Sequence, residues 1–232
     1  MPSSHAAPPV ELDVDLELDP DDWERRQVYY LLTGLVIPRP IAWVSTVSPE
    51  GVDNIAPHSY FNLVSSDPPH VMFASTGVKD TLRNIRASGE FVVNLVTTDL
   101  VEEMNATATD LPPDIDEFDW VGLESAPSRT VGARRVARAK AHFECRVVHD
   151  LPVGNGNMVV GRVTHVHVDP SVWSEGRVAA RLLDPVCRLA GTRYATLGDS
   201  FQLPRPAWAD VQDGSVDDRV PRRSPPEDRR PV

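Results

Sequence analysis

A lysine and several hydroxyl groups stand together in the stretch STGVKDTLRNI at 75–85. Apolar residues three apart and the following Gly89 predict one short helix here, with Asp80 or Thr81 as its cap. The N-terminus of a helix presents unpaired N–H groups and a partial positive charge, which suit an anion. From these residues alone, a phosphate site containing Lys79 and a capped helix beside a solvated lysine are equally good interpretations.

A second candidate stretch, NIAPHSYFNLVSSDPPH at 54–70, combines small polar residues with aromatic ones. As one strand it places His58, Tyr60 and Asn62 on the same face, because side chains alternate along a strand. Such a polar row could hold a planar heterocycle. The pattern by itself favours the simpler interpretation, an ordinary strand that ends in a Pro-Pro turn.

Other motifs that carry chemistry are weak in this sequence. It has no GxGxxG after a strand and no GxxxxGK[ST], and GNGN at 154–157 is interpreted as a turn between strands. His165 and His167 have the spacing of a metal-binding pair, but no third ligand is recognisable, so we predict no metal site. Ser59 follows His58 without the GxSxG elbow, which argues against a hydrolase.

Composition limits the class of protein. The chain has 232 residues, is 41% hydrophobic and carries a formal net charge of −11, which disfavours binding to nucleic acid. Residues 1–24 contain eight acidic residues and no Lys or Arg, so the remainder is almost neutral and the net charge does not exclude an anionic ligand. No stretch approaches a membrane span, and we expect no secretion signal. Cys145 and Cys187 lack disulfide or zinc spacing, which fits the cytoplasm.

The chain divides into three parts by pattern. We expect an acidic N-terminal arm at 1–21, a folded domain at 22–207 and a disordered tail at 208–232 that is rich in Pro, Arg and Asp. Helical patterns are limited to 80–88, 99–107 and 177–183, so the alternation typical of a parallel sheet is missing.

Strand patterns dominate the folded part. They cover 40–48, 70–75 and 90–96, and residues 137–147 alternate between an apolar face and a charged face that we expect to be in contact with water. In the last long strand, at 157–168, the apolar phase slips near Thr164, which predicts a bulge. The sequence therefore predicts a mainly antiparallel β-barrel with a few peripheral helices.

The segment IPRPIAWVSTVSPEGVDNIAPHSYFNLVSSDPPHVMFAS, followed by KDTLRNI and GEFVVNL, resembles the flavin reductase-like family of FMN-binding split-barrel proteins. The resemblance is to the branch that includes flavoredoxins, covers about residues 26–206 and is most specific at 38–95. It implies a mainly β fold, a six-stranded antiparallel split barrel with Greek-key topology. It also implies a homodimer that holds FMN near the subunit interface.

Site residues follow from the same resemblance. Arg39 would support the anion, and His58 stands where an aromatic residue is expected before the serine. The flavin and its phosphate would be bound by Trp43, Ser45, Thr46, Ser59, Tyr60, Phe61, Asn62, Lys79, Asp80 and Thr81.

The implied activity is hydride transfer from NADH or NADPH to flavin, with reduced flavin or electrons passed on to a partner such as a monooxygenase. No catalytic acid or base is assigned, because hydride transfer depends on geometry and on the cofactor's own electron chemistry. The alternative is a flavoredoxin-like FMN-binding electron carrier without a nicotinamide site. A split barrel that has lost flavin and serves as an interaction module is a third interpretation.

Overall fold

The computed structural model describes residues 17–203 and residue 205. The chain divides into two compact units, Met1–Leu197 and Gly198–Val232, and the features below belong to the first. Most of the predicted acidic arm (1–21) and the whole predicted tail (208–232) lie outside the described residues.

Helices are short and few in the described part of the chain. The helices and 3₁₀ turns are η1 (Pro20–Asp22), α1 (Arg25–Leu35), α2 (Asp80–Ser88), η2 (Thr98–Leu100), α3 (Val101–Ala106), α4 (Glu117–Val121), η3 (Pro170–Val172) and α5 (Ala180–Leu183). No helix among the described residues is long and apolar enough to cross a membrane.

Strands make up most of the domain. They are β1 (Arg39–Pro40), β2 (Ala42–Val47), β3 (Asp53–His58), β4 (Phe61–Ser66), β5 (Pro69–Thr76), β6 (Glu90–Leu95), β7 (Ser125–Ala126), β8 (Arg135–Val136), β9 (Ala141–Val153), β10 (Gly156–Val168), β11 (Trp173–Ser174), β12 (Arg177–Val178), β13 (Val186–Arg188) and β14 (Tyr194–Thr196).

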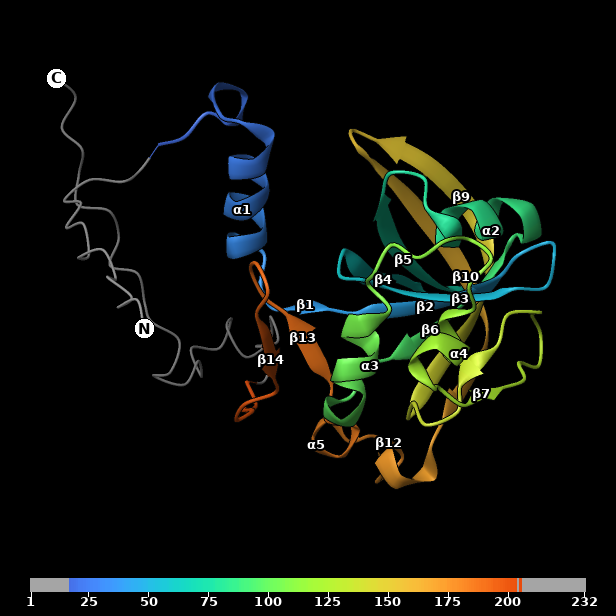
Figure 1. The fold of residues 1–232 in the computed structure, drawn as a ribbon. Coiled ribbons are helices and arrows are strands. Elements are labelled where there is room, and N and C mark those ends of the chain that lie inside the picture. The colour runs from blue at the N-terminus through green and yellow to red at the C-terminus, as the bar shows by residue number, and fades with distance from the viewer. Residues whose placement is uncertain (1–16, 204, 206–232) are drawn as a thin grey trace, which may run out of the picture. The chain divides into compact units, whose positions relative to one another are not determined.

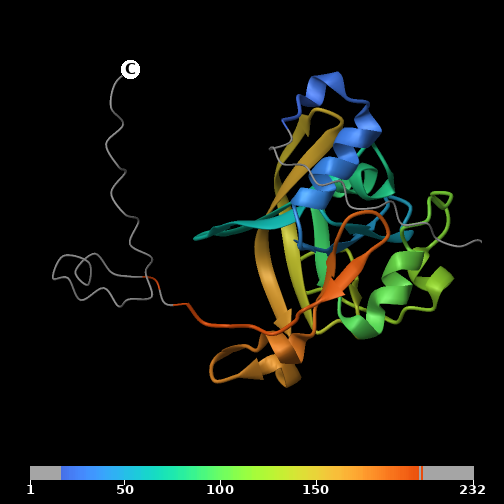
Figure 2. The ribbon, with the colours of Figure 1, turned by 90° about the vertical axis from the view of Figure 1, so that its left-hand side faces the viewer.

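The main sheet has the order β3-β2-β6-β9-β10-β5-β4, and its neighbouring strands are antiparallel. The mainly antiparallel prediction is confirmed, with seven strands in this sheet instead of six (Figure 1). Its two outer strands, β3 and β4, are consecutive in the chain and joined by Ser59 and Tyr60, so the sheet curls back on itself. The long β9–β10 hairpin runs the length of this curled sheet (Figure 2).

Both faces of β2 are buried, because two hydrophobic clusters flank it. Trp43 packs with Ile55 and Leu100 on one side, whereas Ala42 and Val44 face the other cluster. The alternation of side chains along a strand therefore places Trp43 inside a core.

The hydrophobic cluster that contains Ala42 and Val44 leaves no room for a side chain at Gly161 of β10. Phe91 of β6 lies against Gly161, where a Cβ would stand 2.6 Å from Cε1 of the phenylalanine and 3.1 Å from Cβ of Cys145. The glycine is thus required by close packing. Both Cys145 and Cys187 are free thiols, and Cys145 is fully buried whereas Cys187 is only partly buried.

The β9–β10 pair confirms one sequence prediction and corrects another. The register shifts between Val163 and His165, which is the predicted bulge near Thr164. The predicted wet face at 137–147 is wrong, because the strand begins only at Ala141 and both His142 and Glu144 are buried. The segment before β8 covers this face, so charged residues on a strand do not identify a solvated side.

Two other local predictions need correction, and one helix was not predicted at all. That helix is α1, in which Gln27 accepts a hydrogen bond from the N–H of Glu24. The stretch 54–62 is two strands rather than one, with the break at Ser59 and Tyr60. The predicted helix at 177–183 forms only from residue 180, because Arg177–Val178 is β12.

Candidate functional site

A cavity of about 560 Å³ lies where the two outer strands of the main sheet approach each other. Its walls come from the end of β3, the Ser59–Tyr60 link, the end of β5, the start of α2 and the loop after α3. This volume falls within the range of pockets that hold small organic ligands.

Half of the sequence-predicted site residues meet in this cavity. Ser59 and Tyr60 line one wall, and Lys79, Asp80 and Thr81 line another, although they are about 20 residues away in sequence. The cavity therefore brings together both stretches that the sequence analysis selected.

The other five predicted residues do not line the cavity. Trp43 is inside the core and its Nε1 donates to Oγ1 of Thr107 at 2.9 Å. Ser45 is buried and donates to the carbonyl of Arg134, and Thr46 is buried beneath α2. Phe61 packs against the core, whereas Asn62 is exposed and its Oδ1 accepts a hydrogen bond from the N–H of Leu63.

A buried network of hydrogen bonds supports the start of α2 from below. The amide oxygen of Asn54 accepts from Oγ1 of Thr46 and Oγ1 of Thr81, each at 3.1 Å. Nδ2 of Asn54 donates to Oε1 of Glu117 at 2.8 Å, and Asn84 donates to Thr46 at 3.1 Å. Thr46 and Thr81 thus hold α2 in position against β2 and β3.

Glu117 brings a buried carboxylate to the cavity wall. Burial raises its pKa above the usual glutamate range, and the hydrogen bond from Asn54 partly offsets this effect. Its second oxygen, Oε2, is buried and has no hydrogen-bond partner among the described residues. Asn54 begins the selected stretch 54–70 but was not assigned to the site, and Glu117 was missed because it belongs to a five-residue helix distant in sequence from the selected stretches.

The start of α2 forms the cationic end of the cavity. Its N-cap is Lys79, with no side-chain cap, so the prediction of Asp80 or Thr81 as cap is wrong. Asp80 is the first helical residue and forms an ion pair with Arg83 instead. The predicted stop at Gly89 is confirmed, with a φ of 72°. Without a side-chain cap, the first N–H groups of this nine-residue helix suit an external anion.

Lys79 itself faces a carboxylate across the cavity mouth. Its Nζ lies 2.5 Å from Oδ1 of Asp110, which belongs to the loop after α3. Both side chains are largely exposed, so this ion pair contributes little to folding. An anion bound at the start of α2 would compete with Asp110 for the lysine.

The other end of the cavity is aromatic. Tyr60 is 43% exposed, and the guanidinium carbon of Arg39 lies 6.0 Å from the centre of its ring. Arg39 is buried and donates to the carbonyls of Thr33 at 2.8 Å and Val36 at 2.6 Å, at the end of α1. Its Nε also lies 3.5 Å from Oγ of Ser59. Arg39 therefore positions the Ser59–Tyr60 link and does not line the cavity.

His58 contributes an imidazole to the cavity wall beside this link. Its ring packs on Phe73 with the centroids 4.7 Å apart. Burial lowers the pKa of His58 to about 4, so the ring is neutral at pH 7. Its Nε2 is buried without a partner among the described residues, which leaves a polar atom for a ligand to satisfy.

Comparison with known proteins agrees with this geometry. Residues 34–181, more than half of the chain, match the family model described as the flavin reductase like domain. The chain belongs to the flavin reductase-like family. The split-barrel fold and the family that the sequence analysis inferred are therefore confirmed.

Several known proteins are similar to this chain over most of its length. Nitrilotriacetate monooxygenase component B from Bacillus cereus is 36% identical with a TM-score of 0.80, and the match covers 83% of this chain and 100% of that chain. The 2-nitrobenzoate 2-nitroreductase of Pseudomonas fluorescens is 32% identical, with a TM-score of 0.76 and coverage of 83% and 98%. An uncharacterised protein of Halalkalibacterium halodurans is 37% identical over 203 residues, covering 82% and 97%.

Proposed function

We propose that this chain is an FMN-binding oxidoreductase that transfers hydride from NADH or NADPH to flavin. The observation that carries this proposal is that one cavity has both an aromatic end at Tyr60 and a cationic end at Lys79. FMN has the corresponding two ends, a planar ring system and a phosphate. The similarity to a monooxygenase component and to a nitroreductase supports an oxidoreductase.

The residues present fit FMN by their chemistry. Lys79 and the first N–H groups of α2 would bind the phosphate, and Thr81, held by Asn54, would add a hydroxyl. The unpartnered atoms Nε2 of His58 and Oε2 of Glu117 would find partners in the polar groups of the ligand. When bound, the flavin supplies the electron chemistry.

The contribution of this chain to the reaction is to bind and orient. Ser59 and Tyr60, which link the two outer strands of the main sheet, would hold the ring system at this junction, or seam. Arg39 fixes the positions of both residues from the side opposite the cavity. Burial keeps His58 neutral, so this wall adds no positive charge at pH 7. We assign no residue as a proton donor or acceptor in this transfer, because hydride transfer depends on stacking geometry.

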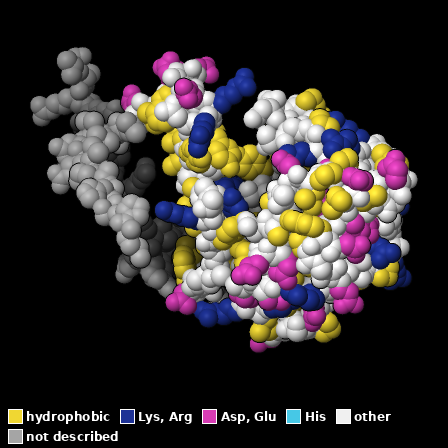
Figure 3. Space-filling model, viewed as in Figure 1, with side chains coloured by type: hydrophobic (Ala, Val, Ile, Leu, Met, Phe, Trp, Pro, Cys, Tyr) yellow, Lys and Arg dark blue, Asp and Glu magenta, His cyan; other side chains and the backbone are white. Residues whose placement is uncertain are grey.

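We further propose a homodimer in the cytoplasm that supplies reduced flavin or electrons to a partner such as a monooxygenase. Hydrophobic side chains gather over α1 in Figure 3, and several there and on β4 are about half exposed or more, which favours coverage by a second subunit. They are Tyr29, Tyr30, Leu32, Leu35, Leu63 and Val64. The molar mass in solution, measured by light scattering, tests the dimer.

The decisive experiment is an anaerobic stopped-flow measurement on protein loaded with FMN. Rapid loss of the flavin absorbance after addition of NADH or NADPH supports the proposal. A flavin that binds but is not reduced by either nucleotide would instead show an electron carrier without a nicotinamide site. A reconstituted protein without flavin absorbance would reject both.

A further inference from the structure

Two glutamate side chains are buried in the described part of the chain, and their surroundings differ. Glu144 of β9 is 0% exposed, and Glu117 of α4 is 6% exposed. A buried carboxylate keeps its charge only where hydrogen-bond donors replace the water that it has lost. The donors around each glutamate therefore decide whether it holds a charge or a proton.

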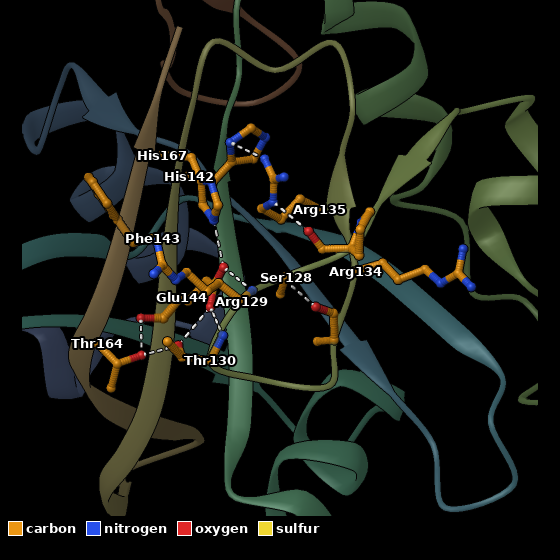
Figure 4. Close-up of polar contacts among 12 residues, drawn as sticks. Ser128, Arg129, Thr130, Arg134, Arg135, His142, Phe143, Glu144, Thr164 and His167 are labelled. Carbon is orange, nitrogen blue, oxygen red and sulfur yellow. Dashed lines mark hydrogen bonds and ion pairs between the residues drawn. The ribbon is translucent and has the colours of Figure 1, made fainter.

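Glu144 has donors at both carboxylate oxygens (Figure 4). The backbone N–H groups of Arg129 and Thr130 donate to Oε1 and Oε2 at 2.7 and 2.5 Å. Oγ1 of Thr130 donates to Oε2 at 2.6 Å, and Nε2 of His167 lies 2.6 Å from Oε1. Burial alone would raise the pKa of Glu144, but these hydrogen bonds lower the pKa to about 2. Glu144 is therefore ionised at neutral pH.

Glu117 has far fewer donors. Nδ2 of Asn54 donates to Oε1 at 2.8 Å, whereas Oε2 has no partner among the described residues. Burial raises the pKa of Glu117, and the charge of Asp80 raises it further, while hydrogen bonds from Asn54 and from the backbone partly offset both effects. Of the two buried glutamates, Glu117 is thus the one that can exchange a proton.

Asn54 links this carboxyl group to the start of α2. Its amide oxygen accepts from Oγ1 of Thr81 at 3.1 Å, so Glu117 and Thr81 lie two hydrogen bonds apart. Both residues line the candidate flavin cavity. Thr81 belongs to the first turn of α2, whose free N–H groups suit a phosphate. A phosphate bound there would lie in the same cavity as the Glu117 carboxylate.

The other charged or titratable groups near Glu117 come from every element around it. They are Lys79, Asp80 and Arg83 at the start of α2, Asp53 and His58 of β3, Glu50 between β2 and β3, Asp110 after α3, and Asp116 and Asp119 at α4. Lys79 already pairs with Asp110, and Arg83 pairs with Asp80. Within residues 17–203 and 205, no cation forms an ion pair with Glu117. A phosphate would add a further negative charge, which favours the protonated carboxyl group.

We propose that Glu117 sets the preference of the candidate flavin cavity for FMN over riboflavin, because its carboxyl group takes up a proton when phosphate occupies the start of α2. This inference rests on the proposed flavin site. Riboflavin lacks the phosphate, so its binding leaves the proton on Glu117 unchanged. Coupling between two ligands is reciprocal, so a proton that binds with the phosphate also strengthens phosphate binding. The preference for FMN over riboflavin must therefore increase as the pH falls.

Fluorescence titrations of the full-length protein with FMN and with riboflavin test this inference. We expect the ratio of the riboflavin dissociation constant to that of FMN to be about threefold larger at pH 6.5 than at pH 8.5. The second ionisation of the phosphate itself, near pH 6, acts in the opposite direction. Absence of FMN binding at both pH values would overturn the proposed function as well. FMN binding with a ratio that does not increase toward pH 6.5 would overturn this inference alone.

Glu117→Gln assigns the effect to this residue. The neutral amide keeps an oxygen for Asn54, so we expect FMN to bind about fivefold more tightly than to the wild type at pH 8.5. Riboflavin binding should not change, and the ratio should no longer increase toward pH 6.5. Glu50→Gln is the matched control, since Glu50 is exposed and shares a neighbouring hollow with Glu117. Wild-type FMN affinity in Glu117→Gln at pH 8.5 would overturn the inference.

Calorimetry on the wild-type protein counts the proton directly, so the test holds even if Glu117→Gln fails to fold. Titrations at pH 7 in two buffers with different ionisation enthalpies give the number of protons taken up with each ligand. We expect net proton uptake with FMN and none with riboflavin. FMN binding without proton uptake would overturn the inference.

Discussion

Nδ2 of Asn54 donates to Oε1 of Glu117 at 2.8 Å, which ties β3 to α4 beneath the candidate flavin cavity. Replacing Asn54 by Ala leaves the carboxylate and the hydroxyl groups of Thr46 and Thr81 without this partner. We expect the free energy of unfolding to fall by about 1–3 kcal/mol, the range for buried polar groups left unsatisfied. Urea unfolding followed by circular dichroism measures this change.

Asn62→Ala is the control for that variant. Asn62 is exposed, and the hydrogen bond that its side chain makes is local, with the N–H of the next residue, so the expected change is within about 0.5 kcal/mol. Equal destabilisation by the two variants would contradict the role given to the Asn54 network.

Lys79→Ala tests the phosphate end of the cavity. Binding of FMN should weaken by about 1–3 kcal/mol, the range for a charge-assisted contact, whereas binding of riboflavin should hardly change. Quenching of flavin fluorescence measures both affinities. Because the Lys79–Asp110 pair is exposed, the variant should fold normally. Equal losses for the two ligands would show that Lys79 does not contact phosphate.

Asp110→Asn changes the same contact from the other side. The carboxylate that competes for Lys79 is removed, so we expect FMN to bind about two- to fivefold more tightly, a gain typical of an exposed ion pair. The same fluorescence titration measures it, with Asp114→Asn as an exposed control in the same loop. Weaker FMN binding in Asp110→Asn would mean that Asp110 assists the ligand.

Gly161→Ala tests the packing between β6 and β10. The new methyl group would overlap the ring of Phe91, so we expect a loss of about 1–3 kcal/mol in the free energy of unfolding. In the control Gly132→Ala, the nearest atom to the added methyl is 3.6 Å away, an ordinary contact. Wild-type stability of Gly161→Ala would show that Phe91 moves aside freely.

Stability should depend on pH through His58 and His142. Burial lowers the pKa of His58 and of His142 from 6.5 to about 4. Between these values the unfolded chain binds more protons, so the stabilisation is fully present above pH 6.5 and is lost as the pH falls toward 4. We expect a loss of about 1–2 kcal/mol per histidine between pH 7 and pH 5, measured by urea unfolding.

His142→Gln should remove about half of that pH dependence. His149→Gln, which replaces an exposed histidine on the same strand, serves as the matched control. An unchanged slope in His142→Gln would show that His142 is not the titrating group.

The fold was largely predictable because its signals are local. The apolar run of β6, the bulge near Thr164 and the stop at Gly89 each depend on neighbours in sequence. The helix α1 was missed because many of its apolar residues are exposed and no core selects one face of it.

The candidate site was only half predictable, because the rest depends on contacts distant in sequence. The family resemblance assigned Trp43 and Ser45 to the flavin site, yet both are buried away from the cavity. The curl of the whole sheet decides which face of β2 lies toward the cavity, and the sequence of the strand does not show this curl. Alternation placed Glu144 in water, yet residues 129 and 130 cover it. No pattern in the sequence of β9 indicates that residues 129 and 130 cover this face of the strand.

The link formed by Ser59 and Tyr60 has a thermodynamic consequence for the whole domain. It joins the two outer strands of the sheet, and the candidate flavin cavity lies at this seam. A ligand bound there would contact β3, β5 and α2 together, so its affinity adds to the cooperative stability of the barrel, about 2.7 kcal/mol at a free concentration 100 times the dissociation constant. Release of the cofactor would then be coupled to thermal unfolding. The melting temperature would increase with the fraction of the protein that holds the ligand.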